Sequence, residues 1–154
     1  MPRRIFISYE GHDREQAKGF HLLRWNTNVE LEFVGRHLLD PVDSTNKDYI
    51  TRKINEQLHG SSVTVVLIGD HTTESDWVAK EIQWSQDKGN GILGIRLKGH
   101  ADAPVPQALV ECGAEITDWD RGEFADAIER AARAAGRAAV LARSGVASGG
   151  TCAR

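Results

Sequence analysis

The sequence has few of the features that mark several large classes of protein. Its only cysteines are Cys112 and Cys152, too few for the disulfide framework of a small secreted domain. The longest apolar run, from Val63 to Gly69, is far too short to cross a bilayer. The opening MPRRIFISYE has no long apolar segment followed by a cleavage site, so we predict no signal peptide. We therefore expect a cytoplasmic protein without a membrane segment.

Clustered positive charge and metal-ligand spacings are also missing. The formal net charge is -3, and no basic stripe emerges, which argues against nucleic acid as the main partner. The six histidines are scattered, and no pair has the spacing of metal ligands, so we expect no metal site. The glycine motifs of Rossmann and P-loop nucleotide sites are absent, as is the GxSxG motif of serine hydrolases.

The apolar patterns predict five strands within a single domain's length of chain, 154 residues. An unbroken apolar run at residues 5–7 is typical of a strand buried on both faces. The most hydrophobic segment, 61–69, is predicted to be the central strand, and a further strand is predicted at 91–99. Residues 29–35 alternate between apolar and acidic side chains, which indicates a half-buried edge strand. A weaker strand is predicted at 114–120.

Helical spacings predict the segments between these strands. A helix begins at Asp13, where Asp13 and Gln16 have the spacing of a capping box. Further helices are predicted over 46–59, around Glu81 and over 120–143. The last segment, 144–154, is small and polar, so we expect one domain at 1–143 followed by a disordered tail.

Strands that alternate with helices predict an α/β fold with a parallel sheet covered by helices on both faces. The half-exposed second strand favours a flavodoxin-like three-layer sandwich, with five parallel strands in the order 2-1-3-4-5. Ligands of such sheets bind beyond the carboxyl ends of the strands, between the first and third strands. Ser8, Tyr9 and Glu10 would lie at this edge, together with the turn 69–77.

Glu81 has an unusual place in its predicted helix. In ESDWVAKEIQWS it falls on one face with Trp77 and Trp84, where apolar residues would be expected. One interpretation is a surface glutamate whose aliphatic stem packs on tryptophan. The other is a desolvated carboxylate beside a cleft, able to stabilise a cationic sugar or act as its nucleophile. Spacing alone leaves both open, and it favours core packing over ligand contact for the two tryptophans.

Two serines are weaker candidates for ligand contact. Ser8 lies at the end of a buried strand, where a small polar residue can simply terminate the strand. Ser44, with its neighbours Asp43 and Asn46, could contact a ligand, although Ser44 or Thr45 also suits an ordinary helix N-cap.

Two motifs at this spacing resemble a known family. FISYEGHD is similar to the first-strand motif of Toll/interleukin-1 receptor (TIR) domains, an apolar strand that ends in Ser-Tyr and precedes an acid. SDWVAKE is similar to the TIR helix signature, with a tryptophan four residues before a glutamate. The resemblance covers about residues 3–135 and is greatest to the TIR-like family of bacterial Thoeris anti-phage systems.

The resemblance implies an enzyme that cleaves the nicotinamide–ribose bond of NAD+, with NAD+ as substrate and no further cofactor. By position, Glu81 would be catalytic, Phe6, Ser8 and Tyr9 would line the nucleotide site, and Trp77 would form its wall. Thoeris family members are expected to cyclise ADP-ribose into a signal that activates a separate effector protein. TIR enzymes often act through self-association, which is a further expectation for this chain.

The sequence departs from the family pattern at two places, and two other functions remain open. Val78 replaces the usual cysteine after the tryptophan, and the loop LLDPVDSTNKD differs from that of animal signalling TIR domains. One alternative is a non-catalytic TIR module that only binds other TIR domains. Another is a phospho-accepting receiver with Asp70 as acceptor, but no lysine ends the predicted fifth strand.

Overall fold

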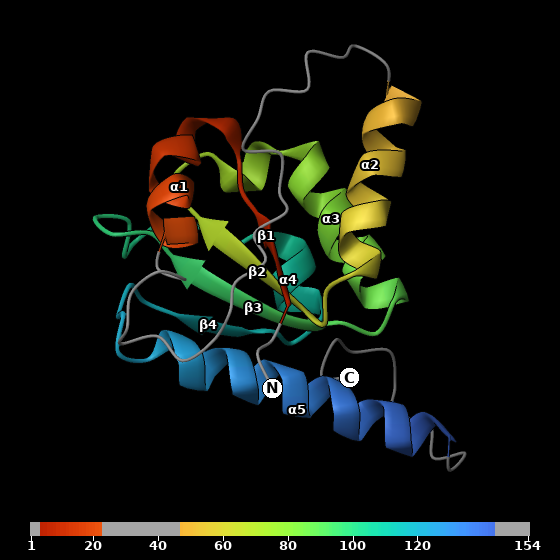
Figure 1. Ribbon diagram of the computed structural model, residues 1–154. Coiled ribbons are helices and arrows are strands. Elements are labelled where there is room, and N and C mark those ends of the chain that lie inside the picture. Colours follow the sequence, from red (N-terminus) through yellow and green to blue (C-terminus); the bar gives the residue numbers. More distant parts are fainter. Residues whose placement is uncertain (1–3, 23–46, 144–154) are drawn as a thin grey trace.

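A four-stranded parallel sheet forms the centre of the computed structural model, which describes residues 4–22 and 47–143. Its strands are β1 (Ile5–Ser8), β2 (Val63–Ile68), β3 (Gly91–Arg96) and β4 (Glu115–Thr117), in the order β1-β2-β3-β4 (Figure 1). The predicted α/β class and parallel sheet are therefore confirmed. The expected strand at 29–35 lies outside the described residues, so five strands in the order 2-1-3-4-5 remain a prediction.

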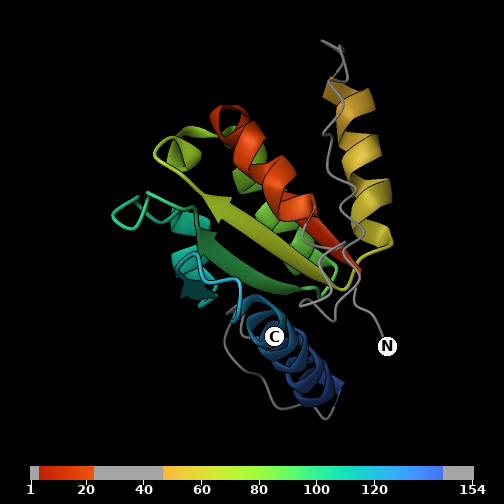
Figure 2. The same ribbon diagram turned by 60° about the vertical axis from the view of Figure 1, so that its left-hand side comes forward.

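Helices cover both faces of the sheet. They are α1 (Arg14–Leu22), α2 (Lys47–His59), α3 (Asp76–Asp87), α4 (Gln107–Glu111) and α5 (Phe124–Arg143). Helices α1 and α5 pack on one face, and α2, α3 and α4 pack on the other (Figures 1 and 2). Short 3-10 turns, η1 (Gly11–Asp13) and η3 (Thr72–Glu74), follow β1 and β2 at their carboxyl ends.

Strand β2 shows why an unbroken apolar run becomes a central strand. All six of its residues are buried, because alternate side chains enter the cores on opposite faces of the sheet. Val65 and Leu67 lie in the core beneath α1 and α5, whereas Val66 and Ile68 contact the core formed with α3 and α4. Both cores therefore depend on this strand.

Helix α5 lies unusually close to the sheet at Gly91. A Cβ atom on this glycine would lie 2.5 Å from the carbonyl oxygen of Ala131. Any side chain at this position would thus displace either the strand or the helix. The glycine at the start of β3 sets the distance between these two elements.

The start of α1 differs from the predicted capping box. The Gln16 Oε1 atom is buried and has no hydrogen-bond partner, so the box between Asp13 and Gln16 is not formed. Instead, Glu10 caps η1, and its carboxylate accepts a hydrogen bond of 2.9 Å from the His12 backbone amide. Asp13 is buried and lies against Gly69 and Thr72. The Asp13 carboxylate thus contacts the turn after β2 and does not cap α1 as the local pattern predicted.

Other predictions concern the remainder of the chain. The short helix α4 lies between β3 and β4, and α5 begins at Phe124, within the predicted helix 120–143. None of the helices in the described part of the chain is long and apolar enough to cross a membrane. The predicted tail 144–154 lies outside the described residues.

Candidate functional site

A cavity of about 370 Å³ lies at the carboxyl edge of the sheet, beside the start of α3. Its lining residues come from the segments after β1 and β2 and from the first turns of α3: Glu10, His71, Glu74, Ser75, Asp76, Trp77 and Lys80. The lining contains three carboxylates, one ammonium group and an indole. This combination favours a ligand that has both positive charge and an aromatic surface.

Helix α3 begins at this cavity because Ser75 caps it. The Ser75 hydroxyl accepts a hydrogen bond of 3.2 Å from the Val78 backbone amide, and Ser75 itself has extended backbone angles. The helix then places Trp77 at the cavity and Glu81 one turn further along. Glu81 is not among the residues that line the cavity.

Glu81 is 2% exposed, which is rare for a glutamate. Of the two interpretations left open by the sequence, the surface glutamate is therefore wrong, and the carboxylate lies in the protein interior. Removing a carboxylate from water has a large free-energy cost unless the group is paired, hydrogen-bonded or protonated. The burial agrees with the desolvated carboxylate of the second interpretation, although burial alone does not assign catalysis.

A pair of buried hydroxyls joins the Glu81 turn to the central strand. The Ser85 hydroxyl donates to the Glu81 backbone carbonyl over 2.7 Å. The same hydroxyl oxygen lies 2.7 Å from Thr64 Oγ1 on β2. Both side chains are fully buried. This arrangement ties the backbone of Glu81 to the sheet and limits movement of the carboxylate.

The two tryptophans on the Glu81 face pack together and against α2. The rings of Trp77 and Trp84 have centroids 6.4 Å apart, and both contact the cluster formed by Phe6, Ile54 and Leu58. Trp77 is only partly buried, lines the cavity, and has the Lys80 ammonium 5.0 Å from its ring centroid. It is therefore both a packing residue and part of the cavity wall.

The candidate site residues in β1 and directly after it lie on opposite faces of the sheet. Phe6 packs with α2 and α3, and Ser8 follows two residues later on the same face. Tyr9 instead belongs to the core beneath α1 and α5. Burial raises the pKa of the Tyr9 hydroxyl, while Arg14 lowers it and Glu81 raises it. The charges of Arg14 and Glu81 thus act on Tyr9 from nearby.

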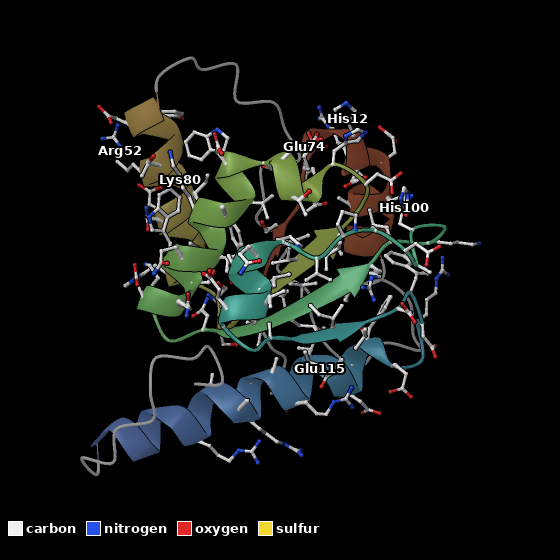
Figure 3. All side chains as sticks on the ribbon, turned by 180° about the vertical axis from the view of Figure 1, so that it is seen from behind. His12, Arg52, Glu74, Lys80, His100 and Glu115 are labelled. Carbon is white, nitrogen blue, oxygen red and sulfur yellow. The ribbon has the colours of Figure 1, made fainter. Side chains whose placement is uncertain are left out.

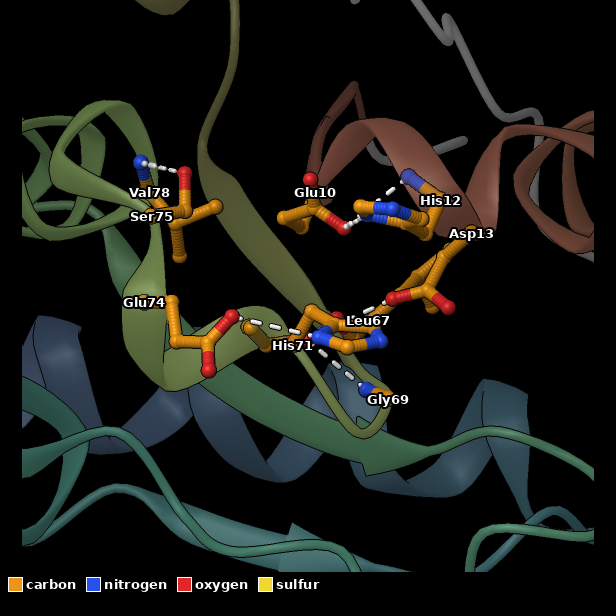
Figure 4. Close-up of polar contacts among 10 residues, drawn as sticks. Glu10, His12, Asp13, Leu67, Gly69, His71, Glu74, Ser75 and Val78 are labelled. Atoms are coloured by element: carbon orange, nitrogen blue, oxygen red, sulfur yellow. Dashed lines mark hydrogen bonds and ion pairs between the residues drawn. The ribbon is translucent and has the colours of Figure 1, made fainter.

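The loops after β1 and β2 meet through two histidines. The rings of His12 and His71 have centroids 4.5 Å apart, and each nitrogen Nδ1 pairs with a glutamate of its own loop (Figure 4). His12 lies 2.8 Å from Glu10, and His71 lies 3.1 Å from Glu74. The hydrogen bond to Glu74 raises the pKa of His71. Figure 3 shows His12 and Glu74 at this edge of the molecule.

Asp13 carries a buried charge beneath these loops. It is 7% exposed, and the Thr72 hydroxyl lies 3.4 Å from its carboxylate. Burial, with the neighbouring Glu10 carboxylate, raises the pKa of Asp13 above its usual value. Asp70, the acceptor of the receiver hypothesis, is exposed and lies 3.0 Å from His100 Nδ1.

The structure thus brings Phe6, Ser8, Trp77 and Glu81 to the side of the sheet that carries α2 and α3, whereas Ser44 lies outside the described residues. The turn 69–77, predicted at the binding edge, contains His71, Glu74 and Asp76, although sequence reasoning did not single them out. Sequence reasoning missed Lys80 and the proximity of Arg14 to Tyr9. His71 could have been recognised as a candidate site residue because it closely follows the predicted strand 61–69. Within residues 4–22 and 47–143, no group of three or more His, Cys, Asp or Glu side chains could hold a metal ion.

Comparison with known proteins identifies related sequences. The family model for the TIR-like domain of the Thoeris protein ThsB matches residues 6–102. A protein of Bacillus cereus (strain MSX-D12), named "Putative cyclic ADP-D-ribose synthase ThsB1", is 33% identical over 107 residues. The match covers 66% of this chain and 55% of that protein, so the chain spans about half the length of its curated relative.

Two solved structures have a similar outline at low sequence identity. The Clostridium botulinum CMP N-glycosidase BcmB is 13% identical, with a TM-score of 0.49 over 79% of this chain and 92% of that one. The TIR domains of the activated Roq1 resistosome, which recognises the pathogen effector XopQ, are 12% identical, with a TM-score of 0.44. That match covers 61% of this chain and 57% of the other.

Proposed function

Because the chain belongs to the TIR-like family of the Thoeris protein ThsB, we propose that it cleaves the nicotinamide–ribose bond of NAD+. The product is an ADP-ribose signal, cyclic in form, that acts on a separate effector protein. The name of the Bacillus cereus relative supports the cyclic product. The single observation that carries the proposal is a glutamate buried to 2% exposure, at the position of the TIR helix signature.

Glu81 acts on the positive charge that develops when the bond breaks. The electron pair of the C1′–N bond leaves with nicotinamide, and the ribose carbon becomes cationic. A hydroxyl of the same ADP-ribose then bonds to this carbon and loses its proton to water, which closes the ring. A buried carboxylate has little competing water, so it stabilises this cation more strongly than an exposed one would. Nicotinamide leaves as a neutral ring, so no general acid is required for its departure.

The neighbouring residues hold the substrate and the carboxylate in place. Trp77 provides an aromatic wall, and Phe6 and Ser8 lie on the same side of the sheet as α3. The acidic side chains of the cavity, Glu10 and Glu74, favour the cationic nicotinamide ring before cleavage. The hydroxyl pair of Thr64 and Ser85 holds the helix that carries Glu81. Ser44 and Tyr9 stay candidate substrate contacts within this proposal.

The test replaces Glu81 with glutamine, which keeps the volume of the side chain and removes its charge. We expect Glu81→Gln to fold and to release nicotinamide from NAD+ at least about a hundredfold more slowly than the parent. Glu111→Gln, an exposed position on α4, is the matched control and should keep parental turnover. Chromatography with mass detection would separate linear from cyclic ADP-ribose in the same samples.

The assay should be run with and without lysate from phage-infected cells, because defence enzymes can require a trigger. Parental turnover by a folded Glu81→Gln variant would refute the catalytic role of Glu81. A parent protein that releases no nicotinamide under either condition, yet self-associates, would favour the non-catalytic TIR module instead.

A further inference from the structure

A second cavity, of about 420 Å³, lies away from the carboxyl edge of the sheet. It is formed between α5 and the residues that begin β3 and β4, including Ile92 and Glu115. Those residues lie at the amino ends of their strands, whereas the cavity at α3 lies at the carboxyl ends. The small side chains Ala131 and Ala134 of α5 leave room for it. We call this cavity the α5 groove.

Three arginines of α5 line the α5 groove. Arg130, Arg133 and Arg137 have the spacing of residues on one helical face. Arg130 donates two hydrogen bonds to Glu115, of 2.9 and 2.8 Å, and Figure 3 shows Glu115 beside α5. Arg133 and Arg137 are exposed, and no hydrogen bond or ion pair joins either to another residue of the described ranges. Three guanidinium groups and one carboxylate leave two positive charges in the α5 groove.

This local charge is opposite in sign to that of the whole chain, which has a formal net charge of -3. A guanidinium group presents donors in a planar fork that fits a phosphate with two parallel hydrogen bonds. Arginines at i and i+4 place their Cβ atoms about 5–6 Å apart, so both side chains can reach one diphosphate.

We propose that the α5 groove binds an organic phosphate of the nucleoside diphosphate class. Arg133 and Arg137 hold the phosphates, and the partly buried side chain of Ala134 contacts the body of the ligand. The volume of the α5 groove falls within the usual range for small-molecule sites, roughly 300–1,000 Å³. The site is separate from Glu81 and does not depend on the proposed NAD+ cleavage.

The competing interpretation is that these arginines form the ordinary solvated face of a surface helix. Calorimetric titration with ADP separates the two, with adenosine as the uncharged probe. The test variant is the double substitution Arg133→Gln/Arg137→Gln, which preserves helix propensity while removing both charges. The control is Arg121→Gln, an exposed arginine in the turn before α5, which changes charge without touching the α5 groove.

We expect the parent and the control to bind ADP alike and the double variant to bind at least about tenfold more weakly. Adenosine should not bind at the α5 groove, and ADP affinity should fall as salt rises from 50 to about 200 mM. NAD+ turnover of the double variant should match the parent. Equal ADP binding by parent and double variant would overturn the proposal, as would an equal loss in Arg121→Gln. A parent that does not bind ADP would overturn it too.

Discussion

The hydroxyls of Thr64 and Ser85, which hold the α3 turn at Glu81, allow us to predict which of the two donates its hydrogen to the other. A serine hydroxyl has one hydrogen, and that of Ser85 goes to the Glu81 carbonyl at 2.7 Å. The 2.7 Å contact between the two hydroxyls therefore requires Thr64 to donate and Ser85 to accept. Ser85 is thus both donor and acceptor, whereas Thr64 is a donor that depends on Ser85. The two positions should respond differently to substitution.

Ser85→Ala removes the acceptor and leaves the Thr64 hydroxyl buried without it, which should lower the free energy of unfolding by about 1–3 kcal/mol. Thr64→Val keeps the side-chain shape, and Ser85 can still donate to the Glu81 carbonyl. Its cost should be about 0.5–1.5 kcal/mol, the net value of one hydrogen bond. In the double variant no hydroxyl is stranded, so it should cost less than the sum of the singles by about 1 kcal/mol.

The assay is urea unfolding followed by circular dichroism, with NAD+ turnover measured on the same samples. If the hydroxyl pair also positions the carboxylate, Ser85→Ala should lose turnover beyond the loss of folded protein. Thr64→Val should retain more activity than Ser85→Ala. Strictly additive stability costs, or a Thr64→Val variant that is less stable than Ser85→Ala, would refute the assigned donor direction.

Three further predictions follow from single positions. Gly91→Ala should lower the unfolding free energy by about 1–3 kcal/mol, because its Cβ would meet the Ala131 carbonyl at 2.5 Å. Gly136→Ala, with nothing within 4 Å, should instead raise it by about 0.5–1 kcal/mol, and equal effects in urea unfolding would contradict the close packing of α5. Since burial raises the pKa of Asp13, its ionisation destabilises the fold: the penalty is complete above the folded pKa and absent below the unfolded one. Asp13→Asn should therefore have a higher free energy of unfolding than the parent at pH 7. Unfolding curves measured at acid pH should show this difference shrinking, and a difference that stays constant with pH would contradict the prediction. Trp77→Ala should lose more NAD+ turnover than its folded fraction explains, with Trp77→Phe intermediate; turnover that only follows the folded fraction would make Trp77 a packing residue.

The elements that the sequence predicted well are those whose pattern is local. Strands β1, β2 and β3 follow predominantly apolar segments, because a strand covered on both faces buries nearly all of its side chains. The polar residue Thr64 of β2 is hydrogen-bonded to Ser85. The helical position of Glu81 between Trp77 and Trp84 follows from a spacing of four and three residues. The two motifs that indicated the family lie within these segments, and the family model matches the same part of the chain.

The tertiary structure alone decided the features that depend on contacts between segments far apart in the chain. Asp13 and Gln16 had the spacing of a capping box, but the packing of η1 against the turn after β2 placed the Asp13 carboxylate beside Thr72. The predicted topology placed Glu10 and the turn 69–77 at one edge, but only the packed structure shows that His71 and Glu10 line the same cavity. The local spacing of Glu81 left a surface position and a buried one both open, and the packed fold buries it. A periodic pattern states which residues share a face, but only the packed fold determines how much of that face water still reaches.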